Sequence, residues 1–224
     1  DNTMAPAANS GTWTITVDDV ASLPLVATSP DAAEPSVNGQ CTLTLTNPSD
    51  QDTVVAYSVT GTANGAADDD FTPLSGTVTI LAGETTATID VSVLDDTILE
   101  GAETVVVTID SYTGDPQITI DPAANSDTVT IADDDVALLA IAATDLNAAE
   151  PDDNGQFTVS LTNPSDQDTV VTYSVPGNSA PGDDFTPLTG TVTILAGETE
   201  ATIDVTVLDD NILEGPEAVV VTLD

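Results

Sequence analysis

The sequence contains no lysine, arginine or histidine, although 39 of its 224 residues are acidic. It therefore has no imidazole general base, no Schiff-base lysine and no arginine clamp for phosphate. Nucleic acid is excluded as a partner because binding to its backbone requires basic side chains that displace counterions. An anionic membrane surface would repel the chain for the same reason. A formal net charge of −39 requires cations from solution, and salt shortens the Debye length from about 10 Å at 0.1 M to about 3 Å at 1 M. We therefore expect a saline or calcium-rich environment.

Cysteine, aromatic residues and long apolar runs are also scarce. Cys41 is the only cysteine, so no disulfide can form within one chain. We expect its thiol to be a small buried apolar group, with an intermolecular disulfide as the alternative. Aromatic residues make up 3% and apolar residues 40%, which predicts folded cores built from valine, isoleucine and leucine. No apolar run approaches the roughly 18 residues of a membrane span, and a chain that begins at Asp1 fits a processed secreted protein or a segment of a longer one.

The sequence is built from two long repeats. Residues 47–55 recur unchanged as residues 163–171, and residues 76–85 recur as residues 190–199. The spacing between the matching segments of the two copies far exceeds the roughly 20 to 50 residues of solenoid repeats, so each copy is expected to be a whole domain.

Within each repeat, apolar and polar residues alternate. Residues 42–45, 77–80 and 87–93 follow this period of two, which is typical of strands with one buried and one wet face. Clusters such as Asn47–Asp50 favour turns between them. The pattern predicts an all-β chain of two tandem antiparallel immunoglobulin-like β-sandwiches.

One segment of the repeat lies out of place. Residues 6–20 resemble residues 122–136, which end the first repeat, whereas the second repeat reaches Asp224 without such a segment. We therefore expect three parts: an N-terminal closing strand over residues 1–20, a first sandwich over residues 21–135, and a second sandwich over residues 136–224 that lacks its last strand.

Acidic residues gather in both repeats at the predicted strand ends, which a sandwich brings together at one pole. Many carboxylates in a small volume cannot all stay ionised without a cation. Hard oxygen ligands in this number favour Ca²⁺, whereas zinc is disfavoured without histidine or a cysteine pair. Any single Asp-Asp pair fits an ordinary turn equally well, but the recurrence in both repeats favours calcium.

Four motifs resemble the Calx-beta domain family: Asp70–Gly76, Leu81–Glu84, Leu94–Glu103 and Ile131–Asp135, of which the first three recur between Asp184 and Glu217. The resemblance implies a calcium-binding sandwich of the kind found in sodium/calcium exchangers and in extracellular adhesion and matrix proteins. Carried over by motif position, it implies these ligands in the first repeat: Glu34, Asp70, Asp95, Asp96, Glu100, Glu103, Asp133, Asp134 and Asp135. In the second repeat it implies Glu150, Asp184, Asp209, Asp210, Glu214 and Glu217, and the N-terminal segment carries Asp18 and Asp19 in place of the missing acidic triplet.

The N-terminal segment also has the pattern of a donor strand, because Trp13, Ile15 and Val17 alternate with threonines. We predict that residues 1–20 of one copy complete the second sandwich of the next by donor-strand complementation. Head-to-tail contacts of this kind build rings or filaments.

The expected function is structural: a subunit of a calcium-stabilised extracellular filament or adhesin stalk, with copies of itself as partners. The alternatives are a segment of a long covalent tandem-repeat adhesin and a calcium-sensing regulatory module. Catalysis is not expected, because paired carboxylates of the glycosidase kind have no aromatic-rich sugar cleft beside them.

Overall fold

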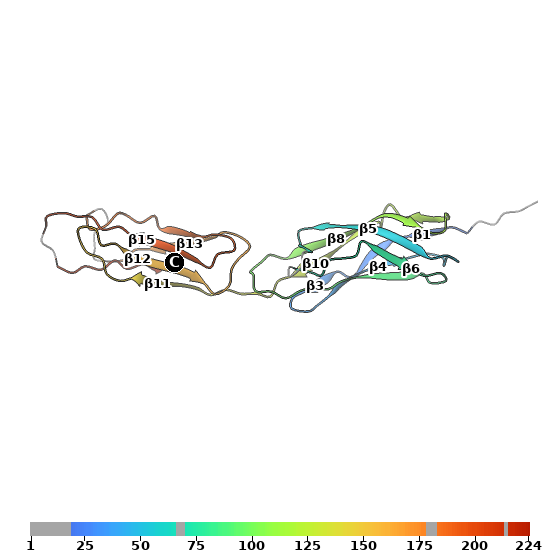
Figure 1. Cartoon of the computed structure of the whole chain (residues 1–224), viewed down its shortest axis with the longest axis horizontal. Helices are drawn as coiled ribbons and strands as arrows, with labels where there is room; N and C mark the ends of the chain where they lie inside the picture. The colour runs from blue at the N-terminus through green and yellow to red at the C-terminus, as the bar shows by residue number, and fades with distance from the viewer. Residues whose placement is uncertain (1–18, 66–69, 178–182, 213–214) are drawn as a thin grey trace, which may run out of the picture.

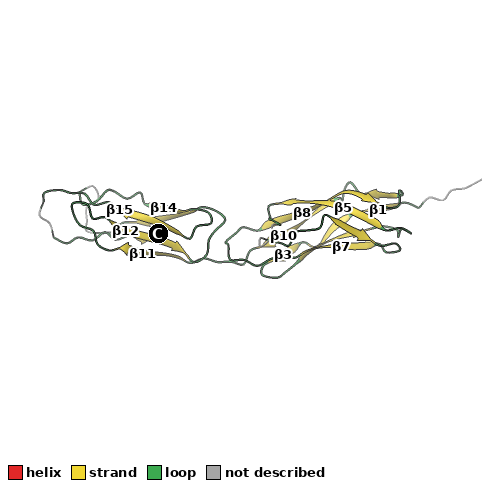
Figure 2. Ribbon diagram, viewed as in Figure 1, coloured by secondary structure: helices red, strands yellow, loops and turns green. Residues whose placement is uncertain are grey.

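The computed structural model describes residues 19–65, 70–177, 183–212 and 215–224, which form two β-sandwiches arranged end to end (Figure 1). Strands and loops make up the whole of this described part, without a helix (Figure 2). It follows that none of the described residues belongs to a helix long and apolar enough to cross a membrane. The predicted all-β tandem of sandwiches is confirmed.

The first domain packs two main sheets face to face. One has the strand order β3-β10-β8-β5-β6 and the other β2-β4-β7, while β1 and β9 form a small parallel pair. The bounds are β1 Ala21–Leu23, β2 Leu25–Ser29, β3 Asp31–Ala33, β4 Gly39–Thr44, β5 Thr53–Gly61, β6 Thr77–Ile80, β7 Thr86–Val91, β8 Glu103–Thr113, β9 Ile118–Ile120 and β10 Ser126–Ala132.

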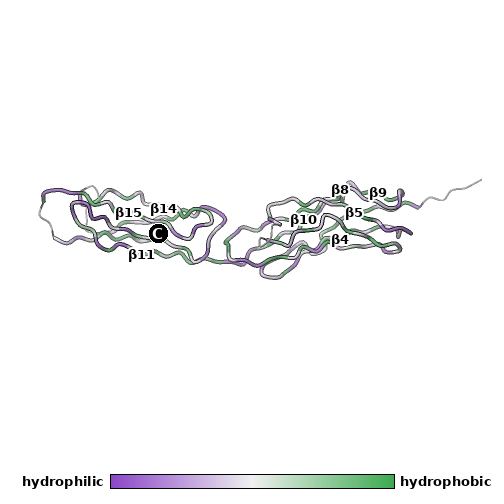
Figure 3. Tube along the Cα trace, viewed as in Figure 1, coloured by the Kyte–Doolittle hydropathy of each residue, from purple (hydrophilic) through white to green (hydrophobic). Residues whose placement is uncertain are grey.

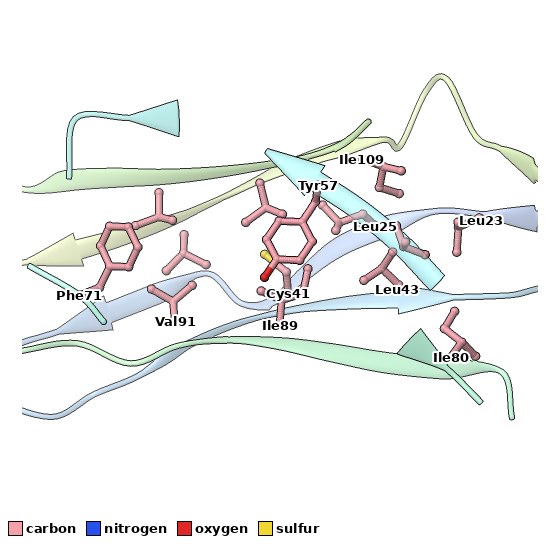
Figure 4. Packing of buried hydrophobic residues seen from close by; sticks show 14 of the residues in the cluster. Leu23, Leu25, Cys41, Leu43, Tyr57, Phe71, Ile80, Ile89, Val91 and Ile109 are labelled. Atoms are coloured by element: carbon pink, nitrogen blue, oxygen red, sulfur yellow. The ribbon is translucent and has the colours of Figure 1, made fainter. Parts of the chain in front are cut away.

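The alternation of residue types builds the core of this domain. In β4, Cys41 and Leu43 are fully buried between half-buried polar neighbours, and in β8 the buried Val105 and Val107 flank the half-buried Val106. Figure 4 shows Cys41 and Leu43 facing Tyr57 between the sheets, and Figure 3 shows apolar stretches along the inner strands. Cys41 thus has the expected role of a small core residue.

Strand β10 closes the first domain. It pairs antiparallel with β8 and parallel with β3, so it joins strands from both ends of the domain sequence. Its Val129 is fully buried and lies against Gly39, where an added Cβ would come within 2.3 Å of Val129 Cγ1. Only glycine therefore fits opposite this valine.

The second domain repeats this plan with fewer strands. Its sheets have the orders β11-β12-β15 and β14-β13-β16, which correspond to β2-β4-β7 and to β6-β5-β8 of the first domain. The bounds are β11 Leu139–Asp145, β12 Gly155–Leu161, β13 Thr169–Ser174, β14 Thr191–Ile194, β15 Glu200–Val205 and β16 Thr222–Leu223. Within the described part of this domain, neither β10 nor β3 has a counterpart.

A groove of about 600 Å³ opens in the second domain where the first domain holds its closing strand. Its lining includes Ala143, Gly155, Phe157, Val205 and Val219. Gly155 corresponds to Gly39, but an added Cβ there would meet nothing closer than 3.4 Å. Val219, the counterpart of the fully buried Val105, is only half-buried. We call this feature the closing-strand groove.

Candidate metal centre

Topology brings the acidic motifs of the first domain to one pole, beside the second domain (Figure 1). Strands β3 and β10 run parallel, so Glu34 after β3 and Asp133 after β10 emerge at the same end. The loop of residues 92–102 joins β7 to β8 at this end and carries Asp95 and Glu100. We call this group of carboxylates the acidic pole.

Three groups of carboxylates at the acidic pole have ligand oxygens within 4.8 Å of one another, and Glu34 belongs to all of them. The groups are Glu34 with Asp133 and Asp135, Glu34 with Asp70 and Glu100, and Glu34 with Asp95 and Asp134. Ca²⁺ binds oxygens at roughly 2.4 Å, so two ligands on opposite sides of one ion lie about 4.8 Å apart. Oxygens within this range of one another can therefore contact one calcium ion.

Burial makes this arrangement unfavourable without a cation. The side chains of Glu34 and Asp70 are only 6% and 3% exposed. Glu34 Oε2 and Asp135 Oδ2 are buried and accept no hydrogen bond from the described residues. The sequence offers no basic side chain to pair with them, and a buried carboxylate without a partner is strongly destabilising. An oxygen-only donor set with buried, unpartnered oxygens fits a hard divalent cation.

The electrostatics agree with this interpretation. Burial, with added repulsion from Asp96 and then Asp133, raises the pKa of Glu34 from 4.5 to about 7. Burial, together with charge repulsion from Asp70 and a hydrogen bond to it, raises the pKa of Glu100 from 4.5 to about 8. Burial and then repulsion by Asp133 also raise the pKa of Asp135. Each shift reflects a charge that the protein itself does not compensate.

Backbone hydrogen bonds hold several of the carboxylates in place. Asp133 accepts from Glu100 N at 2.9 Å through Oδ2 and from Asp135 N at 2.8 Å through Oδ1. Asp70 Oδ2 accepts from Asn64 N at 2.5 Å. The site is therefore partly preorganised, since these loops are already tied to one another before an ion arrives.

Most ligands predicted for the first repeat meet at the acidic pole. Asp96 and Glu103 belong to no close group of the described residues, but Asp96 lies near enough to raise the pKa of Glu34, and Glu103 that of Glu100. The second repeat differs. Glu150 is exposed where its counterpart Glu34 is buried, and in the described part of the second domain no three acids lie close enough to share an ion.

The second-domain acids lack the triplet that the first domain receives from the residues after β10. The carboxyls of Asp184 and Glu217 are hydrogen-bonded, which raises the pKa of Glu217. Asp209 and Asp210 join no close group of the described residues, and Asp19 is exposed. The predicted residues Trp13, Ile15, Val17, Asp18 and Glu214 lie outside the described residues.

A contact at the domain junction escaped the sequence analysis. Leu99, next to the predicted ligand Glu100, donates its N–H to Pro164 O at 2.9 Å and accepts from Asp166 N at 3.1 Å. Sequence reasoning assigned the Asn-Pro-Ser-Asp cluster to a turn only. Its unchanged recurrence as residues 47–50 and 163–166 was the signal for a further role.

Comparisons with known proteins agree with the fold. The family model of the Calx-beta domain matches residues 18–135 and again residues 133–224. An adhesion G-protein coupled receptor V1 from Danio rerio is 28% identical over 162 residues, which cover 70% of this chain and 3% of the receptor. The chain thus spans only a small part of that relative.

Solved structures with a similar arrangement include the crystal structure of CBD12 from CALX1.2, at 17% identity and a TM-score of 0.41, with 84% of this chain and 76% of that chain covered. The calcium binding domain CBD12 of CALX1.1 gives 18% identity and a TM-score of 0.40, with 83% and 76% covered.

Proposed function

The chain belongs to the Calx-beta domain family, and on that premise we propose that it is a structural subunit of a calcium-stabilised extracellular filament or stalk. In this proposal the acidic pole of the first domain binds calcium. The closing-strand groove of the second domain receives residues 1–20 of a neighbouring copy. The observation that carries the proposal is the contrast between Gly39, where an added Cβ would come within 2.3 Å of Val129, and Gly155, where it would make only ordinary contacts of 3.4 Å or more.

Calcium binding rests on the buried carboxylates of the acidic pole. Glu34, Asp70 and Glu100 would hold the ion together with the acids that follow β10, and the ion would neutralise charges that no side chain of this protein can pair. Extracellular modules bind calcium with dissociation constants of roughly 10⁻⁴ to 10⁻³ M. At 100 times the dissociation constant one site adds about 2.7 kcal/mol to the free energy of unfolding.

The N-terminal segment matches the closing-strand groove in pattern and size. By alignment with residues 122–136, Trp13 takes the position of Val129 and Ile15 that of Ile131, both of which are buried in the first domain. A larger side chain suits the larger space, because Trp13 would lie over Gly155 in a groove of about 600 Å³. Burial of an aromatic ring there contributes strongly to binding.

The same segment would also supply acids to the second domain. Asp18 and Asp19 align with Asp134 and Asp135, so strand insertion would deliver them to the region of Glu150 and Asp184. Carboxylates brought together in this way repel one another unless a cation binds. Assembly is therefore expected to be stronger in calcium than in a chelator.

The test removes and then restores the donor segment. A variant without residues 1–17 should remain monomeric in calcium by sedimentation, while the full chain forms elongated polymers visible by electron microscopy. A peptide of residues 6–20 should bind this variant, and a matched peptide with Trp13→Asp and Ile15→Asp should not. Polymers of the shortened variant, or equal binding of both peptides, would contradict strand exchange. If the full chain stays monomeric but binds the peptide, the strand that fills the closing-strand groove comes from the next repeat of a longer covalent chain.

A further inference from the structure

We propose that the loop of residues 47–50, at the free end of the first domain, is a docking site for the second domain of another copy. This inference rests on the proposed head-to-tail assembly and adds to it a second, separate contact. We call residues 47–50 the docking loop. The argument comes from the same sequence elsewhere in the chain, where residues 163–166 already hold an acidic pole.

The occupied loop makes a defined contact. Leu99 of the first domain bridges Ser165 in parallel register, through hydrogen bonds to Pro164 O and from Asp166 N. Because the contact uses backbone groups beside the ligand Glu100, the position of the acidic pole and the position of the next domain are linked.

The docking loop has the same sequence and the same internal framework. Gly83 N donates to Ser49 O at 2.8 Å, as Gly197 N does to Ser165 O at 2.8 Å. Ala82 N donates to an Asp52 carboxylate oxygen at 2.8 Å, and the equivalent bond in the second domain, from Ala196 N to Asp168, is 2.9 Å. The backbone groups that bind Leu99 in one loop are thus presented in the same way by the other.

The chain also enters both domains in the same manner. Asn47 Nδ2 donates to Val20 O at 2.8 Å, and Asn163 Nδ2 donates to Val136 O at 3.0 Å. Val136 directly follows the acids of the first acidic pole, and Val20 directly follows Asp18 and Asp19. If the N-terminal segment closes a neighbour's second sandwich, the acids of that neighbour's second domain therefore arrive beside the docking loop.

The docking loop is free in this structure. Pro48 is exposed whereas Pro164 is half-buried. Among the described residues, Pro48 O and Asp50 N form no hydrogen bond. These are the counterparts of the acceptor and donor that bind Leu99.

The partner with the right chemistry is the second domain of another copy. Its segment 208–217 repeats the segment 94–103 that surrounds Leu99, with changes only at Asn211 and Pro216. Two backbone hydrogen bonds are too few to hold two molecules together alone. Tethered by an exchanged strand, however, the loops would meet at an effective concentration of the order of millimolar.

Cross-linking of full-length protein tests the contact. In the double variant Ile212→Cys/Ser49→Cys, a short bismaleimide in calcium should produce a ladder of covalent multimers. The matched variant Ile212→Cys/Ser58→Cys, with its second thiol at an exposed position in the middle of β5, should give at least tenfold less. Ile98→Cys/Ser165→Cys should cross-link within one chain and verifies the register. Cys41 stays in place, because it is fully buried and burial raises its pKa to about 11.

The outcomes separate this inference from strand exchange. Polymers with no cross-linking above the Ser58 control would overturn the docking site and leave strand exchange intact. Cross-linking that persists unchanged in the variant without residues 1–17 would contradict strand exchange and also the tethered docking proposed here. If neither polymers nor cross-links form, both proposals are wrong.

Discussion

Replacing Glu34 with glutamine should stabilise the first domain in the absence of calcium and remove most of the further stabilisation that calcium gives. The side chain of Glu34 is 6% exposed, and its pKa is raised from 4.5 to about 7. A raised pKa means that the folded state binds the proton more tightly than the unfolded state. The free energy of unfolding of the calcium-free protein therefore falls as the pH rises from about 4.5 through about 7.

The structure sets the size of this effect. At about 1.4 kcal/mol per pKa unit, the shift of Glu34 corresponds to about 3 kcal/mol of destabilisation at pH 8 in EDTA. Glutamine has nearly the same shape and no charge, so Glu34→Gln should recover up to that amount. In calcium the native chain gains about 2.7 kcal/mol at 100 times the dissociation constant. The variant should lose most of this gain, because Glu34 belongs to every close group of carboxylates in the described residues.

The assay is thermal and urea unfolding at pH 8, in EDTA and in calcium. Glu84→Gln is the matched control, because Glu84 lies in an exposed turn of the same domain and its substitution should change neither condition. A Glu34→Gln variant that is less stable than the native chain in EDTA would refute the electrostatic reasoning. A variant with the full calcium gain would refute the assignment of Glu34 as a ligand.

Three further predictions concern protons, the closing-strand groove and the junction. The pKa values of Glu34 and Glu100 are raised to about 7 and about 8, so calcium binding at pH 7 should release protons. Calorimetry in buffers of different ionisation enthalpy would measure this release, which should vanish above about pH 9.5. Gly39→Ala should destabilise the first domain by about 1–3 kcal/mol through overpacking, which thermal unfolding would measure. Gly155→Ala should leave the stability of the unassembled protein within about 0.5 kcal/mol of the native chain. The same variant should form fewer polymers in sedimentation. Chelation should broaden the range of interdomain angles seen by small-angle scattering, because Leu99, which is hydrogen-bonded to the second domain, lies beside a predicted ligand. An unchanged scattering curve would show that the domain junction does not depend on the ion.

Local patterns were enough to predict the strands and the grouping of carboxylates at one pole. Alternation in β4 and β7 identifies the buried side chains, because a strand turns successive residues to opposite faces. The acids fall where strands end, and a sandwich brings several strand ends together. The pKa shifts were beyond sequence reasoning, since they depend on how deeply Glu34 is buried and which carboxylates surround it.

The sequence by itself determined the class of fold, the two repeats, the all-oxygen chemistry of the site and the absence of any internal counter-charge. These follow from residue type and periodicity, which are local properties. Only the tertiary structure decided which carboxylates approach within 4.8 Å, and that the second domain presents an open groove opposite Gly155. It also decided that an Asn-Pro-Ser-Asp turn holds Leu99 of the neighbouring domain. Each of these depends on contacts between segments far apart in the sequence, whose separations are set by packing rather than by the residues nearby.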